Sequence, residues 1–286
     1  MKKFELKITK ELEGVNVKNI LFSKMGLSAK IVSMLKRSGG IILNGEVVTV
    51  RKIVKTGDLL EVIFPKEKSD NIVPSAIELD IIYEDEDVLV VNKPFNMPTH
   101  PSFGHYENTL ANAVMYRYKD GDFVFRAITR LDKDTSGVVL IAKNRIAAYE
   151  LCKQMSQRKI KKEYMAICCG KLPQKNGIVE APIKREKESV IKRIVADDGQ
   201  YARTDYEVIG EKDGYSLVKL MPQTGRTHQI RVHMAHLGTP IFGDFIYGDE
   251  IKGERTRLHC FSLEFEHPST KKMIRCEAKL PKDFEL

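Results

Sequence analysis

The sequence predicts an α+β fold with a small α+β N-terminal domain and a larger domain built on a large, mostly antiparallel mixed sheet. Three observations support this prediction. Residues 1–66 carry nearly all of the net charge, residues 67–76 have the composition of a linker, and residues 77–286 interleave strand-like and helix-like segments. We therefore expect two domains, 1–66 and 77–286, joined by that linker.

The bulk composition is that of a globular protein. The chain has 286 residues, of which 42% are hydrophobic. No segment approaches the roughly 18 apolar residues of a membrane-spanning helix, so we expect a cytoplasmic protein without a membrane partner. The five cysteines form no C-x-x-C pair, which indicates neither a disulfide framework nor a zinc knuckle. We expect reduced thiols in or near the core, and a monomer is favoured.

In the N-terminal domain, the pattern predicts a short helix, a hairpin and a third strand. Ser28 is the expected N-cap of the helix, and Gly39 with Gly40 is its stop. Asn44-Gly45, the strongest two-residue hairpin signal, joins two β-branched runs. Residues 59–64 form the third strand. The apolar residues at helical spacing are Leu27, Ile31, Met34 and Leu35.

Positive charge is concentrated in this domain. Residues 1–66 hold 13 Lys/Arg against 6 Asp/Glu, or +7, whereas the remaining residues hold 34 against 33, or +1. Such a module could bind phosphates, although a solvated basic face would look the same. The basic helix followed by "ILNGEVV" and "KTGDLLEV" resembles the S-four-type RNA-binding domain. This resemblance implies that Lys30, Lys36 and Arg37 contact RNA phosphates.

The second domain mixes strands and helices along the chain. Strand-like runs flank an acidic turn in residues 81–94, and residues 137–143 form a buried strand. Residues 108–118 have helical spacing, and residues 144–159 form a helix that we expect Asn144 to cap. On that helix, Ala148, Cys152 and Met155 share one face. Three later segments alternate or are β-branched and are predicted strands: 201–210, 215–222 and 227–234.

The segment "TRLDKDTSGVVLIAK", residues 129–143, places two aspartates before the buried strand. Its first half fits an EF-hand calcium loop, but the last position of that loop requires a bidentate glutamate and here is Lys143. Strand-like residues also replace the later oxygen ligands, which excludes calcium. By composition alone the segment is a surface turn.

Other motifs change that interpretation. "RLDKDTSG" is preceded by "VVNKPFNMPTHPS" and followed by "KKEYMAICCG" and "TGRTHQIRVHMAHLGTPIFGD". Together these four motifs resemble the RluA/RluD family of RNA pseudouridine synthases, over about 200 residues. The resemblance implies an isomerase that detaches uracil from ribose, turns the ring and rejoins it through a ring carbon, without a cofactor.

This chemistry requires one carboxylate as nucleophile or base, and the resemblance assigns it to Asp132. Desolvation favours the neutral form of a buried carboxylate and a nearby cation reverses this, so the site should contain an arginine. The resemblance favours Arg231 as that partner. The base must leave its stack and is usually held on an aromatic face. Strand alternation puts Tyr164, Ala166 and Cys168 on one face, which makes Tyr164 the stacking candidate.

The remaining site candidates are expected to bind RNA: Arg130, Arg226 and His228. His228, His233 and His236 also invite a metal interpretation. If residues 227–234 are extended, His228 and His233 point to opposite faces and do not converge on one ion. We therefore expect neither metal nor cofactor.

The chain departs from the family pattern at two positions, where Thr129 replaces a common histidine and Asn96 replaces the usual glycine. Asn96 tolerates left-handed backbone geometry. Two other functions stay open at this point: a non-catalytic RNA-binding or ribosome-assembly protein, and a metal-dependent hydrolase acting on RNA. The expected partner is RNA, with large-subunit ribosomal RNA preferred and transfer RNA as the alternative.

Overall fold

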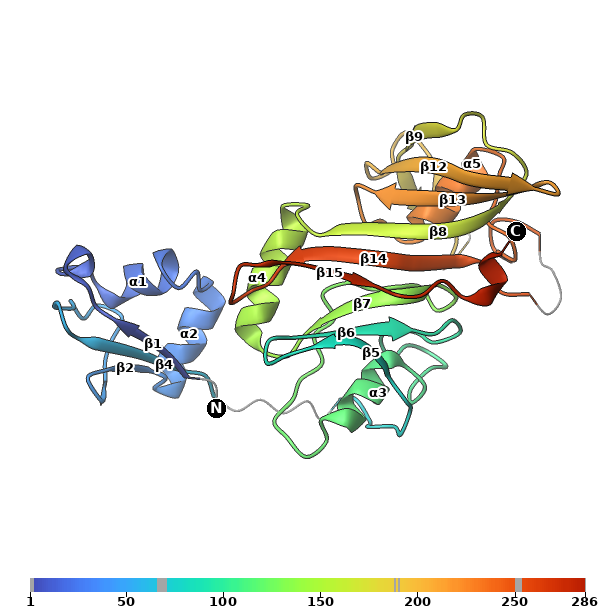
Figure 1. Cartoon of the computed structure of the whole chain (residues 1–286). Helices are drawn as coiled ribbons and strands as arrows, with labels where there is room; N and C mark the ends of the chain where they lie inside the picture. Colours follow the sequence, from blue (N-terminus) through green and yellow to red (C-terminus); the bar gives the residue numbers. More distant parts are fainter. Residues whose placement is uncertain (1–2, 66–70, 188, 190, 250–253, 286) are drawn as a thin grey trace. The chain divides into compact units, whose positions relative to one another are not determined.

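The computed structural model describes residues 3–65, 71–187, 189, 191–249 and 254–285. The chain divides into two compact units, Met1–Lys68 and Ser69–Leu286 (Figure 1). The predicted linker, 67–76, begins within residues that lie outside the described ones. Its later part is held by the second unit, because the Asn112 side chain donates to the Val73 carbonyl at 2.7 Å. In the described part of the chain, no helix is long and apolar enough to cross a membrane.

The first unit is a four-stranded sheet with two α-helices. The strand order is β1-β4-β2-β3, and the described pairs are antiparallel. The strands are β1 (Lys3–Lys7), β2 (Ile41–Leu43), β3 (Glu46–Val47) and β4 (Leu59–Ile63). The helices are a short 3-10 turn (Lys10–Leu12), α1 (Val17–Ser23) and α2 (Ala29–Ser38).

The predicted helix and hairpin of this unit are confirmed. The Ser28 side chain accepts from the Ile31 amide, and Gly39 ends α2 in the left-handed conformation. Val32 and Leu35 are the buried residues of this helix. Asn44 and Gly45 both have positive φ, 51° and 84°, as a two-residue hairpin turn requires. The sequence did not predict β1, which pairs with β4 along its whole length.

The second unit is built on a nine-stranded sheet, as predicted mostly antiparallel. Its order is β5-β6-β7-β14-β8-β13-β12-β9, with β15 paired to β14. The strands are β5 (Asp80–Glu84), β6 (Val88–Lys93), β7 (Ser136–Ala142), β8 (Lys161–Cys169), β9 (Asn176–Glu180), β12 (Arg203–Lys212), β13 (Tyr215–Pro222), β14 (Leu258–Glu266) and β15 (Met273–Glu277). A separate hairpin consists of β10 (Ile183–Arg185) and β11 (Arg193–Val195).

Helices accompany this sheet, with α4 against β7 and β14 and α5 against β12 and β13 (Figure 1). They are α3 (Leu110–Arg117), α4 (Arg145–Ser156), α5 (Gln229–His236) and a 3-10 turn (Lys282–Phe284). Asn144 caps α4 as predicted, accepting from two amides. Of the residues predicted to share one face of α4, Ala148 and Met155 pack against the core, but Cys152, expected in or near the core, is exposed.

The prediction of a strand at 227–234 is also wrong, since this segment forms α5. Every residue from Gln229 to Met234 is buried. A helix that is buried on all sides has no polar face, so its sequence does not show apolar residues recurring at helical spacing. Its β-branched residues then suggest a strand. The argument that placed His228 and His233 on opposite faces of a strand fails with it.

One parallel pairing brings the central strands together. In the described sheet, β7 and β14 are parallel, with Gly137 opposite Cys260, and Cys260 is in turn opposite Tyr164 of β8. A Cβ on Gly137 would lie 2.2 Å from the Cys260 carbonyl oxygen, and its φ is +113°. Only glycine permits this approach. The close approach of Gly137 to Cys260 brings the loop before β7 near Tyr164.

Candidate active site

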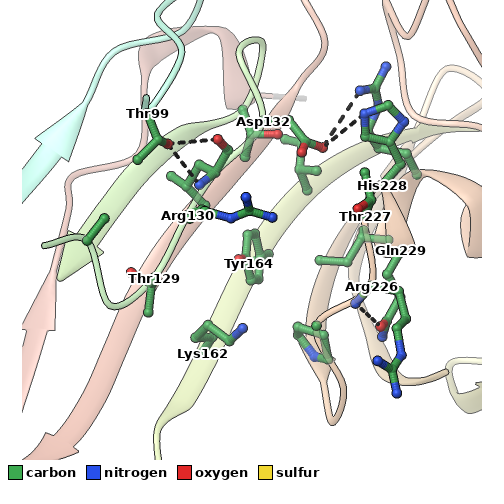
Figure 2. A pocket seen from close by; sticks show the side chains of 18 of the residues that line it. Thr99, Thr129, Arg130, Asp132, Lys162, Tyr164, Arg226, Thr227, His228 and Gln229 are labelled. Atoms are coloured by element: carbon green, nitrogen blue, oxygen red, sulfur yellow. Dashed lines mark hydrogen bonds and ion pairs between the residues drawn. The ribbon is translucent and has the colours of Figure 1, made fainter. Parts of the chain in front are cut away.

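A pocket of about 530 Å³ opens where the loop before β7, strand β8 and the segment entering α5 meet. Figure 2 shows side chains from these three parts around one space. All six residues predicted for the catalytic domain line it: Arg130, Asp132, Tyr164, Arg226, His228 and Arg231. The other three, Lys30, Lys36 and Arg37, are exposed on α2 of the first unit.

Asp132 lies in a loop that two buried side chains hold. The Thr99 hydroxyl donates to the Leu131 carbonyl at 2.9 Å and accepts from the Leu131 amide at 3.2 Å. On the other side, the Lys93 ammonium donates to the carbonyls of Lys133, Met97 and Pro94. The aspartate side chain is thus presented to the pocket from a fixed backbone and is about one third exposed, at 32%.

Lys93 is a fully buried lysine, with 0% exposure. Burial lowers its pKa to about 7, against the opposing charges of Asp132 and Asp134. Its three carbonyl acceptors compensate for part of the lost hydration. Lys93 and Thr99 both belong to the motif "VVNKPFNMPTHPS", but no role was predicted for either residue.

Arg231 projects from α5 and is only 2% exposed. Its Nε and Nη2 donate to Asp244, at 2.7 and 2.6 Å, in a bidentate pair. Burial disfavours the cation, but these hydrogen bonds raise the pKa of Arg231 above its usual value. The third nitrogen, Nη1, lies 3.7 Å from Asp132 Oδ2, which is an ion pair but too long for a hydrogen bond. Asp244 therefore orients a permanent cation beside Asp132.

His228 lies on the same side of Asp132. Its Nε2 is 3.9 Å from Asp132 Oδ2, and its Nδ1 shares a hydrogen bond of 2.8 Å with the Tyr247 hydroxyl. Burial lowers the pKa of His228. The charge of Asp132 opposes this effect, and the charge of Arg231 lowers the pKa further. In the described residues, no three His, Cys, Asp or Glu side chains could together hold a metal ion. His233 instead bonds Thr204 and the Ala181 carbonyl.

Tyr164 forms part of the opposite wall. The predicted alternation along β8 is confirmed, since Tyr164, Ala166 and Cys168 pack in one core cluster and Met165 and Ile167 in another. Burial, the Cys260 thiol and the charge of Asp132 raise the pKa of the Tyr164 hydroxyl well above its usual value. Its ring is a neutral, rigid face in the pocket.

Two predicted RNA contacts lie nearer the opening of the pocket. Arg130 is exposed, and Arg226 is half-buried, with its Nε donating to the Tyr201 carbonyl at 3.0 Å. Thr129, at the position of the usual histidine, is buried and accepts from the Leu140 amide, so it supports the loop. Asn96 has φ +57°, as its replacement of a glycine predicts.

The family model for RNA pseudouridylate synthase matches residues 87–236, which include Asp132, Tyr164 and Arg231. The chain belongs to this family. It is 41% identical to the uncharacterized RNA pseudouridine synthase YjbO of Bacillus subtilis, covering 91% of this chain and 94% of that protein. It is also 37% identical to the ribosomal large subunit pseudouridine synthase D of Xanthomonas campestris, covering 92% and 83%.

The fold agrees with this family. The solved structure of human RNA pseudouridylate synthase domain containing 1 matches with a TM-score of 0.61 and 28% identity, over 71% of this chain and 83% of that one. The resemblance to RluA/RluD-type enzymes is therefore confirmed, and the chain is an RNA pseudouridine synthase. A non-catalytic RNA-binding protein and a metal-dependent hydrolase are no longer favoured.

Proposed function

We propose that this enzyme converts uridines of large-subunit ribosomal RNA to pseudouridine, with Asp132 as the nucleophile or base. The ribosomal assignment is supported by relatives that are named for the large subunit in Xanthomonas campestris and Pseudomonas aeruginosa. Transfer RNA is the alternative substrate. A cytoplasmic location and a monomeric state stay predictions from the sequence.

One observation carries the role of Asp132: its carboxylate lies in a pocket between a buried arginine and a neutral tyrosine ring. In the reaction the bond from ribose to the ring nitrogen breaks, and a bond from ribose to a ring carbon forms. The hydrogen on that carbon leaves as a proton, and the freed nitrogen takes up a proton. Asp132 can attack or accept this proton, and Arg231 stabilises its carboxylate.

We further propose that the first unit is an S-four-type domain that docks RNA. The support is its helix α2, which buries one face and leaves Lys30, Lys36 and Arg37 exposed. These three cations lie on a short, capped helix within a compact unit that has an excess of positive charge.

The catalytic role is tested by mapping pseudouridines in total RNA from cells with and without the gene, with rescue by variants. Asp132→Asn should restore none of the lost sites, whereas Asp134→Asn, a half-buried acid in the same loop, should restore them. Full rescue by Asp132→Asn would refute the mechanism. Loss of transfer RNA sites alone would refute the ribosomal assignment.

The docking role is tested with a triple variant in which Lys30, Lys36 and Arg37 become glutamine. RNA affinity should fall, and the slope of log affinity against log salt should decrease by about two to three. The matched control replaces three exposed lysines elsewhere in the unit: Lys7, Lys10 and Lys55. Equal effects of both variants would show a diffuse charge effect and no docking helix.

A further inference from the structure

Lys162 of β8 is a cation in the pocket to which no role has been given. It lies two residues before Tyr164, so both side chains are on the same face of the strand, about 7 Å apart along it. Both line the pocket, and Figure 2 shows them one after the other along β8. The Lys162 ammonium lies 3.9 Å from where a Cβ on Gly225 would be, so it reaches towards the loop that carries Arg226.

Lys162 differs from its neighbours in having no partner. Lys161 pairs with Glu264 at 2.9 Å, and Glu163 pairs with Lys219 at 2.8 Å. Within the residues that the structure describes, no hydrogen bond or ion pair to the Lys162 ammonium is found. Burial lowers the pKa of Lys162, because the ammonium loses hydration there. A partly desolvated cation without a partner in a cleft is a candidate for a binding residue.

The charge of the pocket indicates the ligand. Arg130, Arg226 and Lys162 line it together, whereas its acid, Asp132, is engaged by Arg231 and His228. Each phosphate of RNA carries a negative charge that these cations can bind. A lysine ammonium is a compact point charge that suits one phosphate oxygen without a fixed orientation.

We propose that Lys162 forms a subsite for the phosphodiester next to the target uridine. This inference rests on the proposed stacking of the flipped uracil on Tyr164. When the uracil ring stacks on Tyr164, the sugar-phosphate backbone of the same nucleotide passes along the adjacent part of the pocket wall. Lys162 and the loop at Gly225 meet there. The subsite places the glycosidic bond above Asp132 by holding the nucleotide at both ends.

The test measures release of tritium from RNA labelled at the ring carbon that becomes bonded to ribose. The substrate is total RNA from cells lacking the gene, so the assay does not depend on which RNA is modified. Lys162→Met should raise KM by about 10-fold or more, which is the usual loss for a hydrogen bond to a charged group. The slope of log KM against log salt should fall by about one. Lys162→Arg should recover most of the affinity and the slope.

The matched control is Lys161→Met, which removes the same charge from the adjacent position on the other face of the strand. It should change KM less than about twofold, because exposed ion pairs contribute little. An unchanged KM for Lys162→Met, or a raised KM with an unchanged salt slope, would overturn the phosphate subsite. If Lys162→Met folds poorly, as its melting temperature would show, Lys162→Gln replaces it.

A parallel arm separates this inference from the proposed mechanism. Asp132→Asn should abolish tritium release while leaving RNA affinity and its salt slope unchanged. If Asp132→Asn stays active, the proposed mechanism fails, but the salt slope of Lys162→Met still decides the subsite. If Asp132→Asn is inactive and the slope of Lys162→Met is that of the wild type, only the subsite fails.

Discussion

The bidentate pair between Arg231 and Asp244 should carry a large share of the stability of the second unit. Asp244 is 0% exposed and accepts two short hydrogen bonds from a guanidinium that is 2% exposed. Its Oδ1 also accepts from the Ile246 amide at 3.1 Å. Asp244→Asn keeps the shape of the side chain and one acceptor oxygen, but it removes the charge.

The cost follows from the burial of the pair. Breaking a buried ion pair by removing one partner costs about 3–5 kcal/mol, because the other charge stays buried. Asp132 offers only partial compensation, since it lies 3.7 Å from Nη1 and is about one third exposed. We expect about 3 kcal/mol for Asp244→Asn. For a unit of this size that lowers the melting temperature by about 6–12 °C.

Differential scanning calorimetry of the full chain measures this shift in the transition of the second unit. Asp132→Asn is the control, because it removes a charge from the other side of the same guanidinium without breaking a hydrogen bond. It should cost less than about 1 kcal/mol. A shift below about 3 °C for Asp244→Asn, or equal shifts for both variants, would refute the assignment of the structural pair to Asp244.

Three further changes test the loop that presents Asp132. The unfolded chain holds the Lys93 proton to about pH 10.5 and the folded chain only to about pH 7, so stability should rise with pH between these values. Chemical denaturation should show that the free energy of unfolding of the wild type, relative to that of Lys93→Met, increases by about 3 kcal/mol from pH 7 to 9.5. If the free energies of both proteins changed equally with pH, this prediction would be contradicted. Gly137→Ala should cost more than about 2 kcal/mol in urea unfolding through its clash with Cys260, and a neutral effect would disprove the close approach. Thr99→Val should cost about 1–3 kcal/mol and lower kcat by unpairing the Leu131 backbone, whereas Thr99→Ser should not; equal effects would exclude the hydrogen bonds as the cause.

Features encoded by neighbouring residues could be predicted from the sequence. Ser28 and Asn144 cap their helices because a short polar side chain bonds amides two or three residues ahead. Asn44 and Gly45 form the hairpin turn because both tolerate positive φ. The alternation along β8 is equally local, and it placed Tyr164 on the correct face.

Features that depend on the whole environment could not be predicted. Helix α5 is buried on every side, so its sequence lacks the polar face that identifies a surface helix. On α4, Cys152 is exposed although it was expected in or near the core, because the strands beneath the helix and not its own spacing decide which residues are covered. Strand β1 is a different case, because its alternation of polar and apolar residues is a local strand signal that could have been used.

The partner of Arg231 shows why motif reasoning stops short of geometry. The need for a cation beside the carboxylate of Asp132 predicted an arginine, and the family resemblance favoured Arg231, whose Nη1 lies 3.7 Å from Asp132. A guanidinium has two further donor nitrogens, however, and a buried site leaves neither unsatisfied. Those nitrogens require hydrogen-bond acceptors, and the motif "GTPIFGD" supplies them as the carboxylate of Asp244. The buried Arg231 therefore lies between two acids, and the fully buried one, Asp244, fixes the position of the cation.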